Sequence, residues 1–269
     1  METWRLVISG PADGAANMAV DEAIMNAVRQ GIAPPTIRLY QWSPPAVSLG
    51  YFQSLEKEID LAACKEAGVD VVRRLTGGRA VLHQSELTYS VTAPEENSKI
   101  RGSVLQSYLA ISRGLVKGLS LLGVEAELSE GKKRSGFNSA ACFDAPSWYE
   151  MVVNGKKLVG SAQTRRNRCL LQHGSMLTDI DADLLFSVLK FANEKLRDRA
   201  KAYFLAKATC LSQIVGYSPD TPALCSSLKK GFEEALEVNL VEQGLMDEEL
   251  EWFSELKQKY GSPEWTALK

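Results

Sequence analysis

Histidine is scarce in this sequence, and the spaced groups of cysteine and histidine that hold metal ions are missing. The 269 residues include only two histidines, and the five cysteines form no CxxC pair. Zinc sites need such spacing, and disulfide frameworks use an even set of cysteines. We therefore expect no metal and no disulfide, with free thiols in a reducing compartment such as the cytoplasm.

Long apolar runs and an excess of one charge are missing too. No stretch of about 18 apolar residues occurs, and the N-terminus lacks the basic and apolar segments of a secretory signal, so no membrane association is expected. The formal net charge is -2. A chain without a positive field is not expected to bind nucleic acid. The phosphate-binding pattern GxxxxGK[ST] is also absent.

The pattern of apolar residues predicts an α+β fold with a mainly antiparallel or mixed sheet and flanking helices. Strand-like segments follow one another in runs instead of alternating singly with helices. The predicted strands are 4–9, 37–41, 46–49, 69–75, 80–83, 87–93, 125–128, 148–153, 157–164 and 168–177, and the clearest helices are 14–30, 59–67, 104–122, 222–237 and 247–260. We expect a catalytic domain over residues 1–240 and a helical C-terminal extension over 241–269, packed on the same unit.

Two glycines lie between strands in RRLTGGRAVLH, residues 73–83. Glycine lets backbone N–H groups approach a ligand closely and turn toward an anion or a carbonyl oxygen. The residues alone allow a ligand-binding turn flanked by Arg73, Arg74 and Arg79, and they equally allow a plain Gly-Gly hairpin with solvated arginines.

Cys142, in FNSAACFDAPSWYE, is either a nucleophile or a small buried side chain. It follows a polar loop that carries Lys132, Lys133 and Arg134, and Lys157 comes fifteen positions later in a neighbouring predicted strand. A nearby ammonium favours the thiolate, which is the reactive form of cysteine. Free cysteines are, however, usually buried hydrophobic residues. The other four are interpreted as packing residues: Cys64, Cys169, Cys210 and Cys225.

The two histidines and a run of small residues are further candidates. His83 and His173 lie near the ends of predicted strands, where a histidine is either a partner of the cysteine or a structural hydrogen-bonding group. Gly160, Ser161 and Ala162 follow Lys157 and permit close approach of a backbone or an extended ligand. A tightly packed sheet would use the same small residues.

These motifs together resemble the lipoate–protein ligase and octanoyltransferase family, which shares a catalytic fold with biotin protein ligases. The family pattern RR-x-[ST]-G-G followed by A-V-x-x-H is matched by Arg73, Arg74, Thr76, Gly77, Gly78, Ala80, Val81 and His83. Its K-x-x-G-S-A pattern is matched by Lys157, Gly160, Ser161 and Ala162, and its HG pair by His173 and Gly174. The resemblance covers nearly the whole chain, up to YGSPEW.

Two departures point to one branch of that family. The ATP-dependent ligases usually carry a third glycine where this chain has Arg79, and an aspartate and an asparagine after the histidine, where this chain reads HQSELTYS. ACFDAPSWYE resembles the octanoyltransferases that modify the H protein of the glycine cleavage system. The resemblance implies that Cys142 forms an acyl-thioester and that Lys157 lowers its pKa.

The implied reaction moves an octanoyl group from octanoyl-acyl carrier protein, through Cys142, to the target lysine of the glycine cleavage H protein or another lipoyl domain. This is the first step of protein lipoylation. We expect a monomer without cofactor or metal, and a narrow apolar tunnel for the eight-carbon chain. The residues expected to bind substrate are Arg73, Arg74, Thr76, Gly77, Gly78, Arg79, His83, Gly160, Ser161, Ala162 and His173.

Three other functions fit the same sequence. An amidotransferase would take octanoyl from the H protein and deliver it to E2 lipoyl domains. An ATP-dependent lipoate–protein ligase would need ATP and free lipoate. A non-catalytic module that binds carrier proteins would keep the fold without the chemistry.

Overall fold

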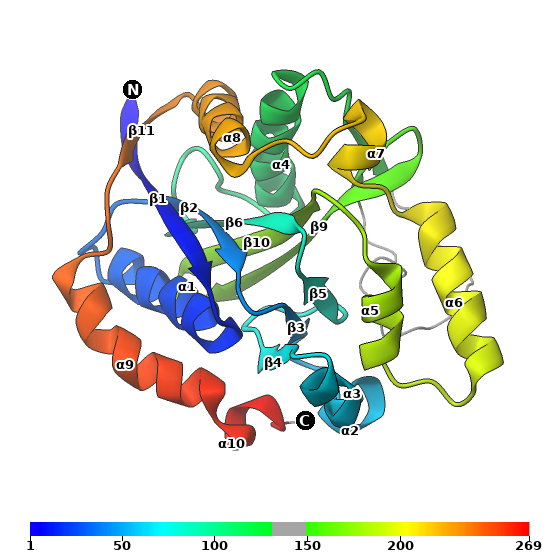
Figure 1. Cartoon of the computed structure of the whole chain (residues 1–269). Coiled ribbons are helices and arrows are strands. Elements are labelled where there is room, and N and C mark those ends of the chain that lie inside the picture. Colours follow the sequence, from blue (N-terminus) through cyan, green and yellow to red (C-terminus); the bar gives the residue numbers. More distant parts are fainter. Residues whose placement is uncertain (131–148, 269) are drawn as a thin grey trace.

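The computed structural model describes residues 1–130 and 149–268, and its centre is an eight-stranded mixed sheet (Figure 1). The strands are β1 (Glu2–Ala12), β2 (Thr36–Trp42), β3 (Ala46–Leu49), β4 (Asp70–Arg73), β5 (Val81–His83), β6 (Glu86–Pro94), β7 (Glu127–Glu130), β8 (Tyr149–Val153), β9 (Lys156–Arg166), β10 (Cys169–Leu177) and β11 (Val238–Glu242). The helices are α1 (Gly14–Arg29), α2 (Leu55–Glu58), α3 (Leu61–Glu66), α4 (Val104–Ser120), α5 (Ala182–Val188), α6 (Glu194–Lys207), α7 (Leu211–Val215), α8 (Thr221–Leu236), α9 (Asp247–Gly261) and α10 (Pro263–Thr266).

The large sheet has the strand order β11-β1-β2-β6-β10-β9-β8-β7. β11 and β2 both pair with β1 in parallel, whereas every pair from β2–β6 to β8–β7 is antiparallel. A separate three-stranded sheet has the order β4-β3-β5. The predicted α+β class with a mixed sheet is therefore confirmed.

Helices cover both faces of the large sheet (Figure 1). α1 and α9 pack on one face, where Met18, Tyr40 and Trp252 belong to a shared apolar cluster. α4 and α8 pack together on the other face, where Leu115 and Phe232 belong to the largest cluster. The small sheet has its own core with α2, α3, α5 and α6.

Glycines let α4 and α8 cross at close range. A Cβ atom at Gly231 of α8 would lie 2.2 Å from the backbone nitrogen of Gly118 in α4. One at Gly114 would lie 2.2 Å from the Phe232 ring. Contacts this short are closer than van der Waals packing allows. The two helices can therefore pack at this distance only because glycine, which has no side chain, occupies both positions.

Several predicted elements differ from the observed ones. The helix predicted over 59–67 is the shorter α3, which begins at Leu61 because Asp60 caps it and accepts hydrogen bonds from the Ala62 and Ala63 backbones. The short helix α2 before it was not predicted. Strands predicted at 46–49, 69–75 and 80–83 form the separate small sheet. β11 was not predicted; it follows Glu237, which ends α8 with a left-handed backbone at φ 52°.

The C-terminal helices are attached to the body of the chain. The predicted boundary at residue 240 falls inside β11, and the division into two parts stays a prediction. Arg5 of β1 forms a buried bidentate ion pair with Glu249 of α9. Within residues 1–130 and 149–268, no helix has the length and apolar character needed to cross a membrane.

Candidate active site

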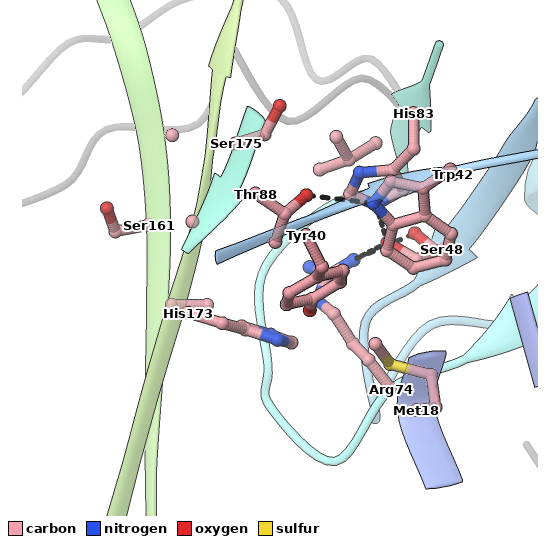
Figure 2. A pocket seen from close by; sticks show the side chains of 14 residues that line it. Met18, Tyr40, Trp42, Ser48, Arg74, His83, Thr88, Ser161, His173 and Ser175 are labelled. Atoms are coloured by element: carbon pink, nitrogen blue, oxygen red, sulfur yellow. Dashed lines mark hydrogen bonds between the residues drawn. The ribbon is translucent and has the colours of Figure 1, made fainter. Parts of the chain in front are cut away.

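A pocket opens between the two sheets, and residues from both predicted motifs meet in it (Figure 2). It encloses about 360 Å³ of empty space, part of which is open to solvent. Six of the residues expected to bind substrate line it: Arg74, His83, Gly160, Ser161, Ala162 and His173. The other lining residues are Met18, Tyr40, Trp42, Ser48, Val81, Thr88, Gly174 and Ser175.

His83 stands at the centre of a chain of hydrogen bonds on one side of the pocket. Its Nδ1 lies 2.9 Å from Glu86 Oε1, and its Nε2 lies 2.7 Å from Ser48 Oγ. A carboxylate only accepts hydrogen bonds, so Nδ1 carries the hydrogen and Nε2 accepts from the Ser48 hydroxyl. The ring also stacks on Trp42, with centroids 4.0 Å apart and planes 13° from parallel (Figure 2).

Glu86 is buried and fully engaged beneath His83. Besides the imidazole, it accepts hydrogen bonds from the hydroxyls of Thr88 and Ser175. Thr88 in turn accepts a hydrogen bond of 2.8 Å from the Trp42 indole. Buried charge is tolerated in proteins when it is surrounded by donors in this way. Glu86 is therefore fixed in place, and it fixes the His83 ring.

His173 heads a second buried chain on the facing strand β10. Its Nε2 lies 2.6 Å from Thr76 Oγ1, and its Nδ1 lies 3.6 Å from Asp21 Oδ2. Burial, together with the charge of Arg74, holds the pKa of His173 below its usual value despite the opposing effect of Asp21. His173 is thus a neutral hydrogen-bonding group at pH 7.

Asp21 is a buried carboxylate with its own set of partners. It accepts hydrogen bonds from Arg38 at 2.9 Å, Tyr40 at 2.8 Å and Ser90 at 3.0 Å. Burial by itself would raise the pKa of Asp21, but the charge and hydrogen bond of Arg38, together with the nearby His173 ring, bring it below its usual value. Burial and the Asp21 charge raise the pKa of Tyr40 well above its usual value.

Arg74 joins the two chains of hydrogen bonds. Its Nε donates to Thr76 Oγ1 at 3.1 Å and its Nη1 to Ser48 Oγ at 3.0 Å. Nη2 donates to the carbonyls of Gly77 and Arg79, at 2.8 and 2.7 Å. One planar guanidinium therefore sets the positions of both hydroxyls and of the Gly-Gly turn.

The Gly-Gly turn fits closely against the loop that follows β3. Gly78 has a positive φ of 95°, and a Cβ atom on Gly50 would lie 2.0 Å from the Gly78 carbonyl oxygen. A side chain at Gly50 would therefore push the turn away. Thr76, Gly77, Gly78 and Arg79 do not line the pocket that the described residues form, but they border Arg74 and His173.

Arg73, also expected to bind substrate, is fully buried outside that pocket. Its guanidinium donates to the carbonyls of Gly50, Tyr51 and Gln53, and to that of Thr266 in α10. Its own carbonyl accepts a hydrogen bond of 2.8 Å from the Trp265 indole. These contacts give Arg73 a structural role, which is to tie the 50–53 loop to α10.

Ser161 on β9 is oriented by a network behind the pocket. Its hydroxyl lies 2.7 Å from that of Tyr89, which accepts a hydrogen bond of 2.9 Å from Gln172. Gln163 donates to Gln172 Oε1 at 2.9 Å and continues the network toward α4. The opposite wall of the pocket is thus as firmly held as the wall that carries His83.

Lys157 lies at the start of β9 and is buried, with 6% of its surface exposed. Its Nζ donates to Glu150 Oε1 on β8 at 3.2 Å. Cys142 and the basic residues Lys132, Lys133 and Arg134 lie outside the described residues. The predicted pairing of Cys142 with Lys157 therefore stays a prediction.

Sequence reasoning missed two buried carboxylates behind the pocket, Asp21 and Glu86, and it missed Ser48, which lines the pocket. Asp21 lies in a helix whose buried positions are otherwise mostly apolar, and Glu86 begins a strand that is buried along nearly its whole length. A charged residue on a buried face is a signal of a paired or functional group. Ser48 lies on β3 and left no comparable signal.

Known proteins resemble this chain over most or all of its length. Residues 13–233 match the lipoyl protein ligase A/B catalytic domain. The octanoyltransferase LipM of Moorella thermoacetica is 47% identical over 98% of this chain and 97% of its own length. The octanoyltransferase LipM of Kyrpidia tusciae is 48% identical over 100% of both chains.

Solved structures show the same fold. A bipartite lipoate protein ligase from Thermoplasma acidophilum superposes with a TM-score of 0.84 at 27% identity, covering 100% of this chain and 98% of its own. Lipoate-protein ligase A bound with ATP gives a TM-score of 0.80 at 26% identity, covering 99% of both chains.

The fold, the pocket and these relatives define an enzyme of the acyltransferase class. The chain belongs to the family of the lipoyl protein ligase A/B catalytic domain. The family resemblance predicted from the sequence motifs is thereby confirmed.

Proposed function

We propose that this acyltransferase of protein lipoylation moves octanoyl from octanoyl-acyl carrier protein to the target lysine of a lipoyl-accepting domain, through a thioester on Cys142. The family acts on lipoyl-accepting domains, and the relatives cited above are octanoyltransferases. We assign the glycine cleavage H protein as the acceptor and a monomer in the cytoplasm as the working form.

The pocket is the observation that carries this proposal. Met18, Val81 and Trp42 give it apolar walls, and Gly160 and Gly174 keep part of it free of side chains. Burial of an eight-carbon chain in such surroundings is favourable by about 0.8 kcal/mol per CH₂. The pocket therefore suits the acyl chain, with the thioester carbon at the polar end beside Arg74, His83 and His173.

Each of the two chemical steps has its own nucleophile. Cys142 thiolate attacks the thioester of the donor, and the pantetheine thiol leaves. The acceptor amine then attacks octanoyl-Cys142, forms the amide and releases the thiolate. Lys157 holds the thiolate by its charge, and backbone N–H groups near Gly77–Gly78 or Gly160–Ser161 donate to the oxyanion of each tetrahedral intermediate.

The donor thioester already carries the activation that ATP supplies to a ligase. Arg79 stands where the ligases usually carry a third glycine, and HQSELTYS lacks the aspartate and asparagine that they place after the histidine. These departures, together with the octanoyltransferase relatives, support the transferase over the ATP-dependent lipoate ligase.

The test is an intact-mass measurement on the purified chain after incubation with octanoyl-acyl carrier protein, without ATP. A gain of one octanoyl group that hydroxylamine removes and that Cys142→Ser lacks is the expected result. Cys64→Ser is a matched control, since burial raises the pKa of that thiol to about 11 and it stays unreactive.

Other outcomes point to the alternatives. Labelling only by octanoyl-H protein would favour an amidotransferase that serves E2 lipoyl domains. Lipoylation that requires ATP and free lipoate, and that Cys142→Ser leaves intact, would favour a ligase. No transfer under any of these conditions would favour a module that only binds carriers.

A further inference from the structure

We propose that Ser48, His83 and Glu86 form a proton relay that removes a proton from the acceptor amine in the second half-reaction. This proposal rests on the proposed function, because it assigns the group that prepares the lysine for acyl transfer. It differs from the assignment of Lys157, which concerns the thiolate. Hydroxyl, imidazole and carboxylate follow one another here in the order used by serine hydrolases.

The geometry sets the direction in which a proton can travel. Glu86 accepts the hydrogen on His83 Nδ1 at 2.9 Å, so Nε2 is the basic nitrogen, and it lies 2.7 Å from Ser48 Oγ. The ring cannot turn away, since Trp42 stacks on one face at 4.0 Å. A proton that reaches Ser48 from the pocket can therefore pass on only to Nε2.

Ser48 has one position left for the substrate. Its hydroxyl donates to His83, and one lone pair of Oγ receives Arg74 Nη1 at 3.0 Å. Among the described residues no second donor to that oxygen is present, and Ser48 lines the pocket. The remaining lone pair is thus available to an N–H group that enters the pocket.

The proton balance is complete without another reactant. The acceptor lysine leaves its ammonium proton in the solvent and enters as the neutral amine. As its nitrogen bonds to the thioester carbon, the nitrogen acquires a positive charge and must lose one further proton before the amide forms. That proton passes to Ser48 Oγ while the Ser48 hydroxyl proton moves to His83 Nε2. Glu86 stabilises the resulting imidazolium, the carbon–sulfur bond breaks to give thiolate, and His83 releases the proton to that thiolate or to water.

The facing chain of Thr76, His173 and Asp21 is less suited to this task. The distance from His173 Nδ1 to Asp21 is 3.6 Å, longer than a hydrogen bond, and Asp21 is neutralised by Arg38 at 2.9 Å. Thr76 does not line the pocket that the described residues form. Accordingly we place the base at His83 and treat Glu86 as its positioning residue.

The experiment separates the two half-reactions. Octanoyl-enzyme is first formed from octanoyl-acyl carrier protein and counted by mass, and its decay is then timed with apo H protein or with hydroxylamine. Hydroxylamine is largely unprotonated at pH 7, and because it is a small free nucleophile it passes its proton to solvent water after attack, so it does not need an enzyme base. Variants Ser48→Ala and Glu86→Gln are compared with Ser175→Ala, which removes a hydroxyl from the same pocket and also contacts Glu86.

We expect Ser48→Ala and Glu86→Gln to slow transfer to the H protein by roughly 10²-fold, the usual effect of a lost general base. Formation of octanoyl-enzyme and its cleavage by hydroxylamine should fall far less, and Ser175→Ala should transfer faster than Ser48→Ala. Equal slowing with both nucleophiles, or equal slowing in Ser175→Ala, would overturn the relay. Absence of octanoyl-enzyme in the wild type would instead overturn the proposed function.

Discussion

Lys157 of β9 forms an ion pair with Glu150 of the neighbouring antiparallel strand β8, with Nζ donating to Oε1 at 3.2 Å. The lysine is more deeply buried than its partner, whose side chain is 24% exposed. A buried ammonium needs such a partner, because an uncompensated charge in that position is costly. The Glu150 carboxylate would also compete with a nearby thiolate for interaction with the Lys157 ammonium.

This pair gives the first prediction. Lys157→Met should slow alkylation of Cys142 by iodoacetamide at pH 7 about tenfold or more, since a neighbouring cation shifts an ionisable group by about 1–3 pKa units. Glu150→Gln should accelerate it, because the ammonium then has one anionic partner fewer. Peptide mass spectrometry identifies the labelled residue. If the alkylation rate rose in both variants or fell in both, the charge of Lys157 would not control the reactivity of Cys142.

Two other thiols, those of Cys169 and Cys225, should contribute little to the alkylation that is measured. Burial raises the pKa of Cys169 to about 12 and that of Cys225 to about 11. At pH 7 such thiols are almost entirely protonated and react slowly.

A second prediction concerns chain length. Met18 is buried on α1 and lines the pocket, whereas Met25 is buried on the same helix away from it. Met18→Ala should shift the preference among hexanoyl, octanoyl and decanoyl donors toward decanoyl, by about fourfold per added CH₂. Met25→Ala should cost similar stability and leave the preference as it is. Competition between the three donors, read by intact mass, gives the ratio directly.

A third prediction follows from His173, whose folded pKa is lowered from 6.5, first by burial. Below pH 6.5 the unfolded chain binds this proton before the folded chain does, so the free energy of unfolding should decrease as the pH falls. Urea unfolding between pH 7.5 and pH 5 measures the slope. His173→Gln should flatten it. An unchanged slope in that variant would assign the loss of stability to other groups.

The fourth prediction tests the crossing of α4 and α8. Gly231→Ala places a methyl group 2.2 Å from the Gly118 nitrogen and should lower the free energy of unfolding by about 1–3 kcal/mol or more. Gly244→Ala is the matched control, because a Cβ atom there meets nothing within 4 Å. Chemical denaturation of both variants decides the matter, and equal midpoints would show that the helices can separate at no cost.

The sequence predicts the local elements of this fold better than their assembly. The pair Asn154-Gly155 is typical of a tight hairpin turn, and both residues have positive φ, at 50° and 73°, as that turn requires. β11 was not predicted because it is short and its place is set by pairing with β1, whose residues lie 236 positions earlier, as in Glu2 with Val238. The alternation of apolar and polar residues likewise does not indicate which strands belong to the large sheet and which to the small one.

In the site, too, local motifs could be predicted from the sequence, whereas contacts between distant residues could not. The motif residues His83, His173 and Gly160–Ala162 were found from the sequence and do meet in one pocket. Ser48 and Asp21 were not, because a serine in a strand or an aspartate in a helix has no pattern of its own. Their importance comes from contacts with His83 and His173 that only the folded chain makes.

The contacts of Arg73 have a consequence for synthesis of the chain on the ribosome. Its guanidinium holds the loop at 50–53, and it is itself held by Thr266, 193 positions further on. The loop lies against the Gly77–Gly78 turn, so that turn receives its final support late. While residues 263–266 are still inside the ribosome, the nascent chain lacks this brace, so we expect the Gly77–Gly78 turn to reach its final position only after they emerge.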